Sequence, residues 1–531
     1  MNRPHRVATA AALVAFLAPG LLAGCGTTSS SPDLNAPTTL TVMAGSEVKD
    51  LVPLLPDIKS ATGVTLVLSY SGTLEGAEAI ASGAATDIAW FSSGHYLSLL
   101  PGAGSRIVAQ QKIMLSPVIL GVKRSVADRF GWTNNPDVTW KDIQAKSADG
   151  SFRFAMTNPA ASNSGLVALI GVASALSGSS DSIDTGTINT TALRAFFKGQ
   201  ALTAGSSGFL ADSYVRDQDT VDGIVNYESI LMSLNAGGQL HEPLALIYPK
   251  EGIVTADYPF MLLNAAKRDA YDKVTAYLRT PDVQKRIMTD TLRRPAIPGV
   301  PLDPRFTSQT LIELPFPARL ETIDALITAY LDEVRRPASA VFVLDVSGSM
   351  QGDRLNQLKT AMAALTGTDP SLTGRFARFR AREQVTIITF STQVQDTRAF
   401  TIDDTAPTGP DMTAIRDYVN GLQTFNSTAI YSALEAAYAT IAQAQAADPN
   451  RLFSIVLMTD GENNAGVPAD QFSRDYTALA APVRAVHTYT VLFGDANKDA
   501  MNSIATLTGG ALFDATTTSL ETIFKQIRGY Q

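Results

Sequence analysis

A short polar turn in the C-terminal part of the chain constrains the fold more than any other stretch. The five residues before it, Ala340 to Leu344, are apolar and are typical of a buried strand. The turn reads Asp-Val-Ser-Gly-Ser-Met, which puts Asp345, Ser347 and Ser349 at alternate positions. A carboxylate and two hydroxyls spaced in this way can converge on one hard cation, and Gly348 lets the backbone bend. The pattern predicts a strand end that holds a divalent ion.

A plainer interpretation of this turn is a strand-to-helix connection in which Asp and Ser cap the helix. Two further elements favour the metal interpretation. Thr428 stands in the polar stretch Asn-Ser-Thr-Ala-Ile-Tyr, and Asp460 follows the apolar residues Leu457 and Met458. Strand and helix signals alternate throughout residues 340–531, which is typical of an α/β domain.

These three elements, in this order, resemble the metal-ion-dependent adhesion site of von Willebrand factor type A (VWA) domains. The resemblance implies a doubly wound α/β domain over residues 337–531. It also implies a metal site made of Asp345, Ser347, Ser349, Thr428 and Asp460. The chain departs from the family before the threonine, where two glycines are common and Asn426-Ser427 stand instead.

In the family, one coordination position of the ion stays open for a carboxylate of a partner protein, so a protein partner is expected. The oxygen ligands favour Mg²⁺, with Mn²⁺ or Ca²⁺ as alternatives, over Zn²⁺. Asp460 is expected to act through water or through its neighbours, and less directly than Asp345.

The first 24 residues have the layout of an export signal. Two arginines precede an apolar segment, Val7 to Leu22, which ends in Leu22-Ala23-Gly24-Cys25. This ending resembles the lipobox of bacterial lipoproteins, and the resemblance implies that Cys25 becomes lipid-modified and forms the new N-terminus. The alternatives are an ordinary signal peptide and an uncleaved membrane helix, and Pro19-Gly20 disfavours the helix. We expect a chain held by lipid at the outer face of the bacterial cytoplasmic membrane.

Composition limits the remaining possibilities. A chain of 531 residues exceeds a single core, because domains commonly hold about 100–200 residues. Without residues 1–24 it carries 40 Lys and Arg against 50 Asp and Glu, a net charge of −10, so nucleic acid is not an expected partner. Residues 25–37, rich in Ser, Thr and Pro, are typical of a polar tether. With one cysteine, burial of apolar surface must hold the fold.

Residues 38–336 repeat a pattern of strand, polar turn and helix. The strand-like residues 38–44 lead into Gly45-Ser46-Glu47, and residues 64–69 lead into Tyr70-Ser71-Gly72-Thr73. A third polar strand end is Thr86 to Ser93. Such repeats predict an open parallel sheet, in which ligands bind outside the carboxyl ends of the strands.

These strand ends, together with Thr157 to Gly165, Asn226 to Ser229 and Leu246 to Gly252, resemble the type II periplasmic binding-protein fold. Within that fold the likeness is greatest to the lineage of molybdate and sulfate receptors. The resemblance implies two lobes that close on a solute held by Ser46, Ser71, Thr73, Ser92, Ser162, Ser164 and Tyr227. Hydroxyls and helix-start amides can bind an oxyanion or a neutral polar solute, although each serine could also cap a helix.

The sequence predicts a binding protein and not an enzyme. It lacks a phosphate-binding Gly-rich loop with Lys, a Gly-x-Ser-x-Gly turn and a His-Glu metal helix. Glu462 is the nearest candidate for a base beside the metal, and its position is common for a plain loop residue. Two functions remain open. The first is a surface receptor that binds a protein partner through the cation and holds a solute in its N-terminal domain. The second is the solute receptor of an ABC transporter with an accessory VWA domain. The complete second domain favours the first.

Overall fold

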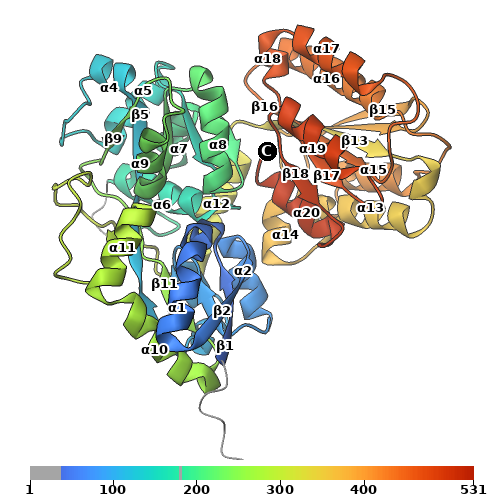
Figure 1. Ribbon diagram of the computed structural model, residues 1–531. Coiled ribbons are helices and arrows are strands. Elements are labelled where there is room, and N and C mark those ends of the chain that lie inside the picture. Colours follow the sequence, from blue (N-terminus) through green and yellow to red (C-terminus); the bar gives the residue numbers. More distant parts are fainter. Residues whose placement is uncertain (1–37, 179–181) are drawn as a thin grey trace, which may run out of the picture. The chain divides into compact units, whose positions relative to one another are not determined.

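The computed structural model describes residues 38–178 and 182–531, and the part of the chain from residue 38 onwards forms one compact unit (Figure 1). The expected signal segment (1–24), the lipid site at Cys25 and the tether (25–37) lie outside the described residues. Among the described residues, no helix combines the length and the apolar character that crossing a membrane requires.

The N-terminal part of this unit has two lobes, and lobe 1 is built on a five-stranded sheet of order β2-β1-β3-β11-β4. Leu40, Val42 and Ala44 of β1 are buried at alternate positions, as expected for a strand with a period of two. The strands are β1 (Thr38–Ala44), β2 (Val64–Tyr70), β3 (Ile88–Trp90), β4 (Ala109–Lys112) and β11 (Pro259–Leu262). The helices of lobe 1 are η1 (Ser46–Leu54), α1 (Leu55–Thr62), α2 (Thr73–Ala81), α3 (His95–Leu99), η2 (Gly104–Arg106), η4 (Ala265–Lys267), α10 (Arg268–Leu278) and α11 (Pro281–Thr291).

Lobe 2 has a second sheet of order β10-β5-β8-β6-β7, and β9 and β12 also pair with β5. Its central helix α6 (Asn163–Ser177) is apolar on nearly every side and is buried over most of its length, as expected for a helix covered all round. The strands are β5 (Met114–Lys123), β6 (Phe154–Thr157), β7 (Gln200–Ala204), β8 (Gly223–Tyr227), β9 (Leu244–Ile247), β10 (Thr255–Ala256) and β12 (Arg294–Pro295). The other helices are α4 (Arg124–Phe130), α5 (Trp140–Ala148), α7 (Thr190–Phe197), α8 (Ser207–Asp217), η3 (Gln218–Thr220) and α9 (Glu228–Ala236).

Neither sheet is the all-parallel sheet that the strand–helix repeats predicted. In lobe 1, β11 runs antiparallel to both β3 and β4. In lobe 2, the long strand β5 runs antiparallel to β8, β9, β10 and β12. The physical reason is that the chain passes between the lobes, from β4 to β5 and back from β10 to β11, and the returning strands enter each sheet in the opposite direction.

A helical segment joins lobe 2 to the C-terminal domain. It consists of α12 (Leu320–Ala329) followed by the π-helical turn η5 (Tyr330–Val334). Ile323, Ile327, Leu331 and Val334 are buried, and their spacing of three or four residues places them on one face of the helical segment. Only three residues separate the turn from the next strand, so the joint is short.

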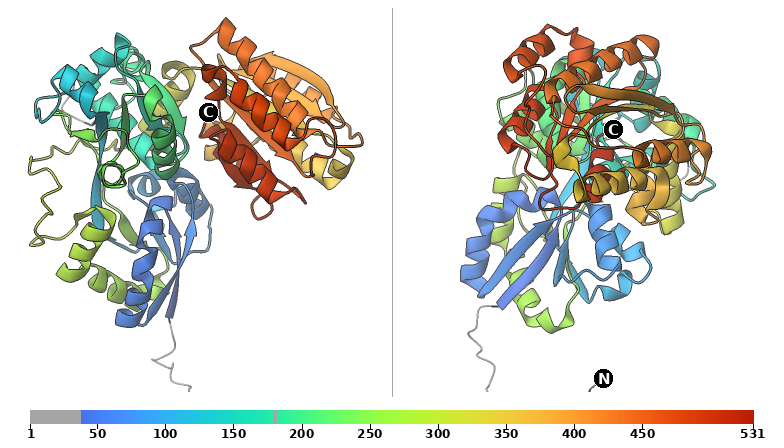
Figure 2. Two further views of the ribbon diagram at one scale, coloured as in Figure 1. Left: turned by 45° about the horizontal axis from the view of Figure 1, so that its top comes forward. Right: turned by 90° about the vertical axis from the view of Figure 1, so that its right-hand side faces the viewer.

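The C-terminal domain has a six-stranded sheet of order β15-β14-β13-β16-β17-β18, and β15 is its antiparallel edge strand. The central strand β13 (Ala338–Asp345) is buried along its whole length. Phe342 and Leu344 pack into one apolar cluster, and Val341 and Val343 into another on the opposite face. Helices therefore cover both faces of the sheet (Figure 2).

The other strands of this domain are β14 (Gln384–Phe390), β15 (Val394–Thr401), β16 (Leu452–Thr459), β17 (Thr488–Leu492) and β18 (Leu512–Asp514). The helices are η6 (Gly348–Met350), α13 (Asp353–Ala363), η7 (Ala364–Thr368), α14 (Leu372–Ala377), α15 (Pro410–Asn420), α16 (Ile430–Ala447), α17 (Ala469–Ala478), α18 (Ala481–Arg484), α19 (Lys498–Leu507) and α20 (Leu520–Arg528).

Gly510, in the turn between α19 and β18, gives a first testable prediction. A Cβ atom at this position would lie 1.9 Å from the carbonyl oxygen of Thr488 in β17. We expect Gly510→Ala to destabilise the domain by about 1–3 kcal/mol, because backbone must move to admit the methyl group. Thermal unfolding measures the change. Gly208→Ala in α8 is the control, since its Cβ would meet no atom within 4 Å and alanine favours a helix. A Gly510→Ala protein as stable as this control would contradict the prediction.

Candidate functional site

The turn after β13 lies at the carboxyl ends of the central strands of the C-terminal sheet. Asp345 ends β13 and its side chain is fully buried. Its Oδ1 accepts a hydrogen bond from the amide of Ser347 (2.7 Å), and its Oδ2 accepts one from the hydroxyl of Thr459 at the end of β16 (2.5 Å). Burial raises the pKa of Asp345 to about 6. The carboxylate is therefore held by donors but lacks a full countercharge.

The remaining predicted metal ligands surround the same point. The hydroxyls of Ser347 and Ser349 are 3.0 Å apart, and that of Ser349 donates to Oδ1 of Asp460 (2.7 Å). A Cβ atom built on Gly461 would have the hydroxyls of Thr428 and Ser349 as its nearest neighbours, at 3.4 and 3.6 Å. The fold thus brings together all five residues that the sequence singled out.

The loop that carries Thr428 is fixed on both sides, although Asn426-Ser427 replaces the two glycines. The carbonyl of Asn426 accepts a hydrogen bond from the amide of Gly348 (2.9 Å). The amide of Thr428 donates to the side-chain oxygen of Asn464 (2.8 Å). The departure from the family pattern therefore leaves the loop beside the Asp345 turn.

The sequence did not point to Arg354, which stands on α13. Its guanidinium lies 2.7 Å from Oδ2 of the buried Asp460 and 2.6 Å from Oδ2 of Asp495. Arg354 comes eight residues after Val346 in the motif turn, but nothing in its spacing identifies a distant aspartate as its partner. Because Arg354 holds one oxygen of Asp460, this aspartate is poorly placed to serve as a direct ligand, and its indirect role at the metal stays a prediction.

The donor set fits a hard divalent cation. It contains hydroxyls and two carboxylates from three separate loops, with no imidazole or thiolate. Within the described residues, no group of three or more His, Cys, Asp or Glu side chains is placed to hold a metal. A site composed mostly of hydroxyls does not depend on such a group. Glu462, the candidate base, is exposed and accepts a hydrogen bond from Asn497 (3.0 Å).

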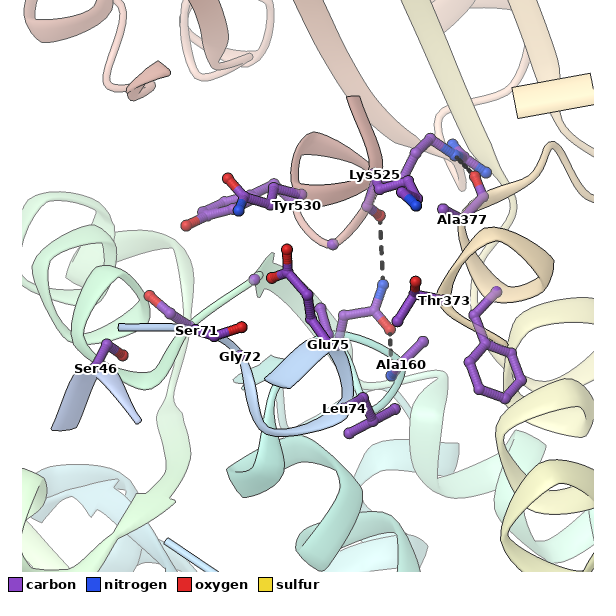
Figure 3. Close-up of a pocket in the computed structure, with 18 of the residues that line it drawn as sticks. Ser46, Ser71, Gly72, Leu74, Glu75, Ala160, Thr373, Ala377, Lys525 and Tyr530 are labelled. Atoms are coloured by element: carbon purple, nitrogen blue, oxygen red, sulfur yellow. Dashed lines mark hydrogen bonds between the residues drawn. The ribbon is translucent and has the colours of Figure 1, made fainter. Parts of the chain in front are cut away.

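In the structure the predicted solute residues form three pairs, and Thr73 stands apart from them. Ser46 and Ser71 line a cavity of about 360 Å³. Ser92 and Tyr227 form a hydrogen bond from one lobe to the other, from the tyrosine hydroxyl to the serine Oγ (3.0 Å). Ser162 and Ser164 bond to each other (3.1 Å), and Thr73 is buried at the start of α2. The cavity opens beside the ends of β1, β2 and β6 (Figure 3).

Two residues near Tyr227 were missed by the sequence analysis. Asn163 donates its side-chain amide to the tyrosine hydroxyl (3.1 Å), and that hydroxyl also lies 3.3 Å from Oε1 of Glu47. Burial raises the pKa of Glu47, although its own backbone amide and Arg293 oppose this effect. A carboxylate next to Ser46 was visible in the sequence, but its contact with a residue 180 positions away was not.

The raised pKa of Glu47 gives a prediction about stability and pH. A carboxyl with a raised folded-state pKa contributes most below its unfolded value of about 4.5, and its contribution is lost as pH rises through the folded value. We expect Glu47→Gln to remove this loss, so the melting temperature of the variant should gain on that of the wild type as pH rises from 4.5 to 8. The control is Glu251→Gln in lobe 2, whose carboxylate accepts hydrogen bonds from the amides of Trp140 (2.9 Å) and Lys141 (3.4 Å). A difference in melting temperature between Glu47→Gln and the wild type that stays constant from pH 4.5 to 8 would contradict the prediction.

Comparison with known proteins identifies the two parts of the chain. The model of the bacterial extracellular solute-binding protein family matches residues 40–290, and that of the von Willebrand factor type A domain matches residues 340–526. The chain therefore carries a bacterial extracellular solute-binding protein domain followed by a C-terminal VWA domain. It is an α/β protein with two mixed sheets in the first domain and a mostly parallel sheet in the second. The resemblances to a solute-binding protein domain and to a VWA domain are confirmed, whereas the lipobox and the metal site stay predictions.

Solved structures of low sequence identity resemble the separate parts. The sulfate-binding protein SubI from Mycobacterium tuberculosis H37Rv is 18% identical, with a TM-score of 0.38, and the match covers 50% of this chain and 88% of that chain. For the periplasmic binding protein AfuA from Actinobacillus pleuropneumoniae the identity is 12%, the TM-score 0.43 and the coverage 56% and 99%. A von Willebrand factor type A protein from Catenulispora acidiphila is 18% identical, with a TM-score of 0.28 and coverage of 37% and 43%. No curated protein matches significantly.

Proposed function

We propose that this protein is a lipid-anchored receptor whose VWA domain binds a protein partner through a divalent cation, while its N-terminal domain binds a small polar solute. The observation that carries the proposal is the convergence of Asp345, Ser347, Ser349, Thr428 and Asp460 at one edge of the sheet. Mg²⁺ is the expected ion, since the donors are hard oxygens. When bound, the cation offers a coordination position to a carboxylate of the partner.

The chain's own residues prepare this site. Ser347 and Thr459 orient the carboxylate of Asp345. Arg354 holds Oδ2 of Asp460, while Oδ1 of the same carboxylate accepts a hydrogen bond from Ser349. Hydroxyls carry no charge, so a bound divalent ion would keep excess positive charge and attract an acidic side chain. Glu462, the candidate base, accepts a hydrogen bond from Asn497 (3.0 Å), which favours binding over catalysis.

The proposal divides the chain into a signal segment (1–24), a lipidated Cys25 with its tether (25–37), a solute-binding domain (38–336) and a VWA domain (337–531). The location is the outer face of the bacterial cytoplasmic membrane. By family, the first domain implies a small-solute ligand and an ABC transporter. The candidate contacts for the solute remain Ser46, Ser71, Thr73, Ser92, Ser162, Ser164 and Tyr227, and an oxyanion is among the candidate solutes.

A second function, as the solute receptor of an ABC transporter with an accessory VWA domain, is favoured by one observation. A cavity lined by Ser46 and Ser71 lies at the carboxyl ends of strands β1 and β2, where α/β sheets bind ligands.

Affinity capture from solubilised cell envelope distinguishes the two functions. The mature protein is used as bait with Mg²⁺, with EDTA, and as Asp345→Ala, and Asp470→Ala is the control. Asp470 is exposed on the same domain and forms an ion pair with Arg474 on its own helix (2.9 Å). Partners that are lost with EDTA and with Asp345→Ala, but kept by the control, support the cation-dependent receptor. An ABC permease retained by every bait supports the transport receptor and overturns the first proposal.

A further inference from the structure

The VWA domain contacts lobe 1 through its helix α14, whose Phe376 joins an apolar cluster formed mainly by residues of the two lobes. Glu78 on α2 accepts hydrogen bonds from the amides of Leu372 (2.6 Å) and Thr373 (3.0 Å), and from the hydroxyl of Thr373 (2.7 Å). These residues begin α14, where the first amides have no partner within the helix and the helix dipole favours a negative charge. The contact is charge-assisted and bidentate, so it fixes both the position and the orientation of α14 relative to α2.

A different part of the VWA domain contacts lobe 2. His487, just before β17, lies with its Nε2 3.1 Å from Oδ2 of Asp217 at the end of α8. Arg216 also lies 3.0 Å from the same carboxylate oxygen and 3.0 Å from the histidine nitrogen. This second contact is mostly shielded from solvent, because the side chains of His487 and Asp217 are 10% and 19% exposed.

The C-terminal end of α20 approaches lobe 2 too closely for ordinary side chains. A Cβ atom on Gly529 would lie 2.6 Å from the Cβ of Ala161, and one on Gly205 would lie 2.5 Å from the ring of Tyr530. The Tyr530 ring packs edge-on against Phe209, with centroids 4.9 Å apart. The two backbone segments meet where each has a glycine, Gly529 after α20 and Gly205 after β7, and the absence of a side chain permits tight packing.

The cavity at the strand ends has walls from all three bodies (Figure 3). Lobe 1 contributes Ser46 and Ser71, lobe 2 contributes Asn158 and Ser206, and α20 with its C-terminal turn contributes Lys525 and Tyr530. The VWA domain thus covers the place where the two lobes face each other. Beneath it, Tyr227 of lobe 2 bonds to Ser92 of lobe 1, so the lobes are in contact.

We propose that the VWA domain is a clamp that holds the two lobes of the solute-binding domain closed. A body fixed to two lobes at separate points resists a change in their relative orientation, because opening must break the contact at Glu78 or the contact at Asp217. Docking of the VWA domain and closure of the lobes are then coupled, and the coupling is reciprocal. Anything that pulls the VWA domain away opens the cleft, and anything that favours closed lobes favours docking.

Distances between spin labels test the clamp without a solute or a partner. With Cys25 replaced by serine, cysteines are placed in pairs at exposed Lys59 on α1, Lys141 on α5 and Asn502 on α19. The first pair reports the separation of the lobes, and the pairs with Asn502 report docking of the VWA domain. The variant is Glu78→Ala with Asp217→Ala. Its matched control is Asp272→Ala with Asp137→Ala, which removes one exposed ion pair inside each lobe.

In the wild type and the control, we expect narrow distance distributions for all pairs. In the variant, the distances to Asn502 should lengthen, and the open population seen between Lys59 and Lys141 should rise at least about ten-fold, the factor expected when two ordinary contacts are lost. Release of the VWA domain with an unchanged distance between the lobes would overturn the clamp. A variant in which the VWA domain stays docked would also overturn it, because the two carboxylates would then not hold the domain.

Discussion

Replacing Asp345 by asparagine is expected to abolish the stabilisation of the VWA domain by Mg²⁺. The physical reason is that asparagine keeps the shape of the side chain but loses the charge that a cation requires. A ligand that binds the folded state alone stabilises it by about 2.7 kcal/mol at one hundred times its dissociation constant. For a domain of this size, that energy raises the melting temperature by about 5–10 °C. The measurement is thermal unfolding with millimolar Mg²⁺ and with EDTA.

The same variant should be at least as stable as the wild type in EDTA. Burial raises the pKa of Asp345 to about 6, so at pH 7.5 the folded protein carries a charge that its surroundings disfavour. The stability of the wild type without metal falls as pH rises through that value, and the neutral amide does not suffer this loss. Asp470→Asn, on an exposed helix of the same domain, should keep the full response to Mg²⁺. An Asp345→Asn protein that still gains stability from Mg²⁺ would rule out this metal site.

Strand and helix signals in the sequence predicted an α/β domain over residues 340–531, and the resemblance of its polar turns to the VWA family implied the doubly wound sheet. The apolar run before Asp345 gives β13, whose alternate residues supply the two apolar clusters on either face of the sheet. The predicted ligands meet at one edge because the carboxyl ends of parallel strands lie side by side there. Thr459 and Arg354 were missed, since each acts on an aspartate more than 100 positions away. Pairings at such distances leave no local pattern.

The solute-binding domain was predictable in class but not in topology. Local repeats of strand and helix suggested parallel sheets, whereas β5 and β11 are antiparallel because the chain passes between the lobes. The hydrogen bonds from Tyr227 to Ser92 and from Thr373 to Glu78 join distant parts of the chain. Such contacts depend on how folded lobes and domains pack against one another, whereas composition and periodicity in the sequence describe only the helices and strands within each of them.

The second large effect is expected at Glu383, at the start of β14. Its carboxylate is buried and accepts hydrogen bonds from Arg335, from the amide of Arg380, and from Arg528 through both oxygens (2.9 and 2.7 Å). Arg335 follows the turn η5 and Arg528 ends α20, so one acid joins the domain joint to the C-terminal helix. Burial alone would raise the pKa of Glu383, but Arg528 and Arg335 outweigh it and hold the pKa below its usual value.

Glu383→Gln should therefore cost about 3–5 kcal/mol at pH 7, because two buried guanidinium groups lose their shared countercharge. The melting temperature should fall by about 10 °C. The matched control is Glu333→Gln, whose carboxylate is 54% exposed and lies 3.8 Å from Arg194. An exposed pair of this kind contributes about 0–1 kcal/mol, so the control should unfold close to the wild type. Equal melting temperatures for the two variants would contradict the proposed contribution of Glu383 and its arginine partners to stability.

The pH dependence separates loss of charge from loss of packing at Glu383. A carboxyl with a lowered folded-state pKa stabilises the protein above its unfolded value of about 4.5, and this contribution is lost as pH falls through the folded value. The difference in melting temperature between wild type and Glu383→Gln should then be largest near pH 7 and shrink below pH 4.5. A difference that stays constant on acidification would mean that glutamine disturbs the packing around Arg335 and Arg528, and that the charge of Glu383 contributes little to the stability of this joint.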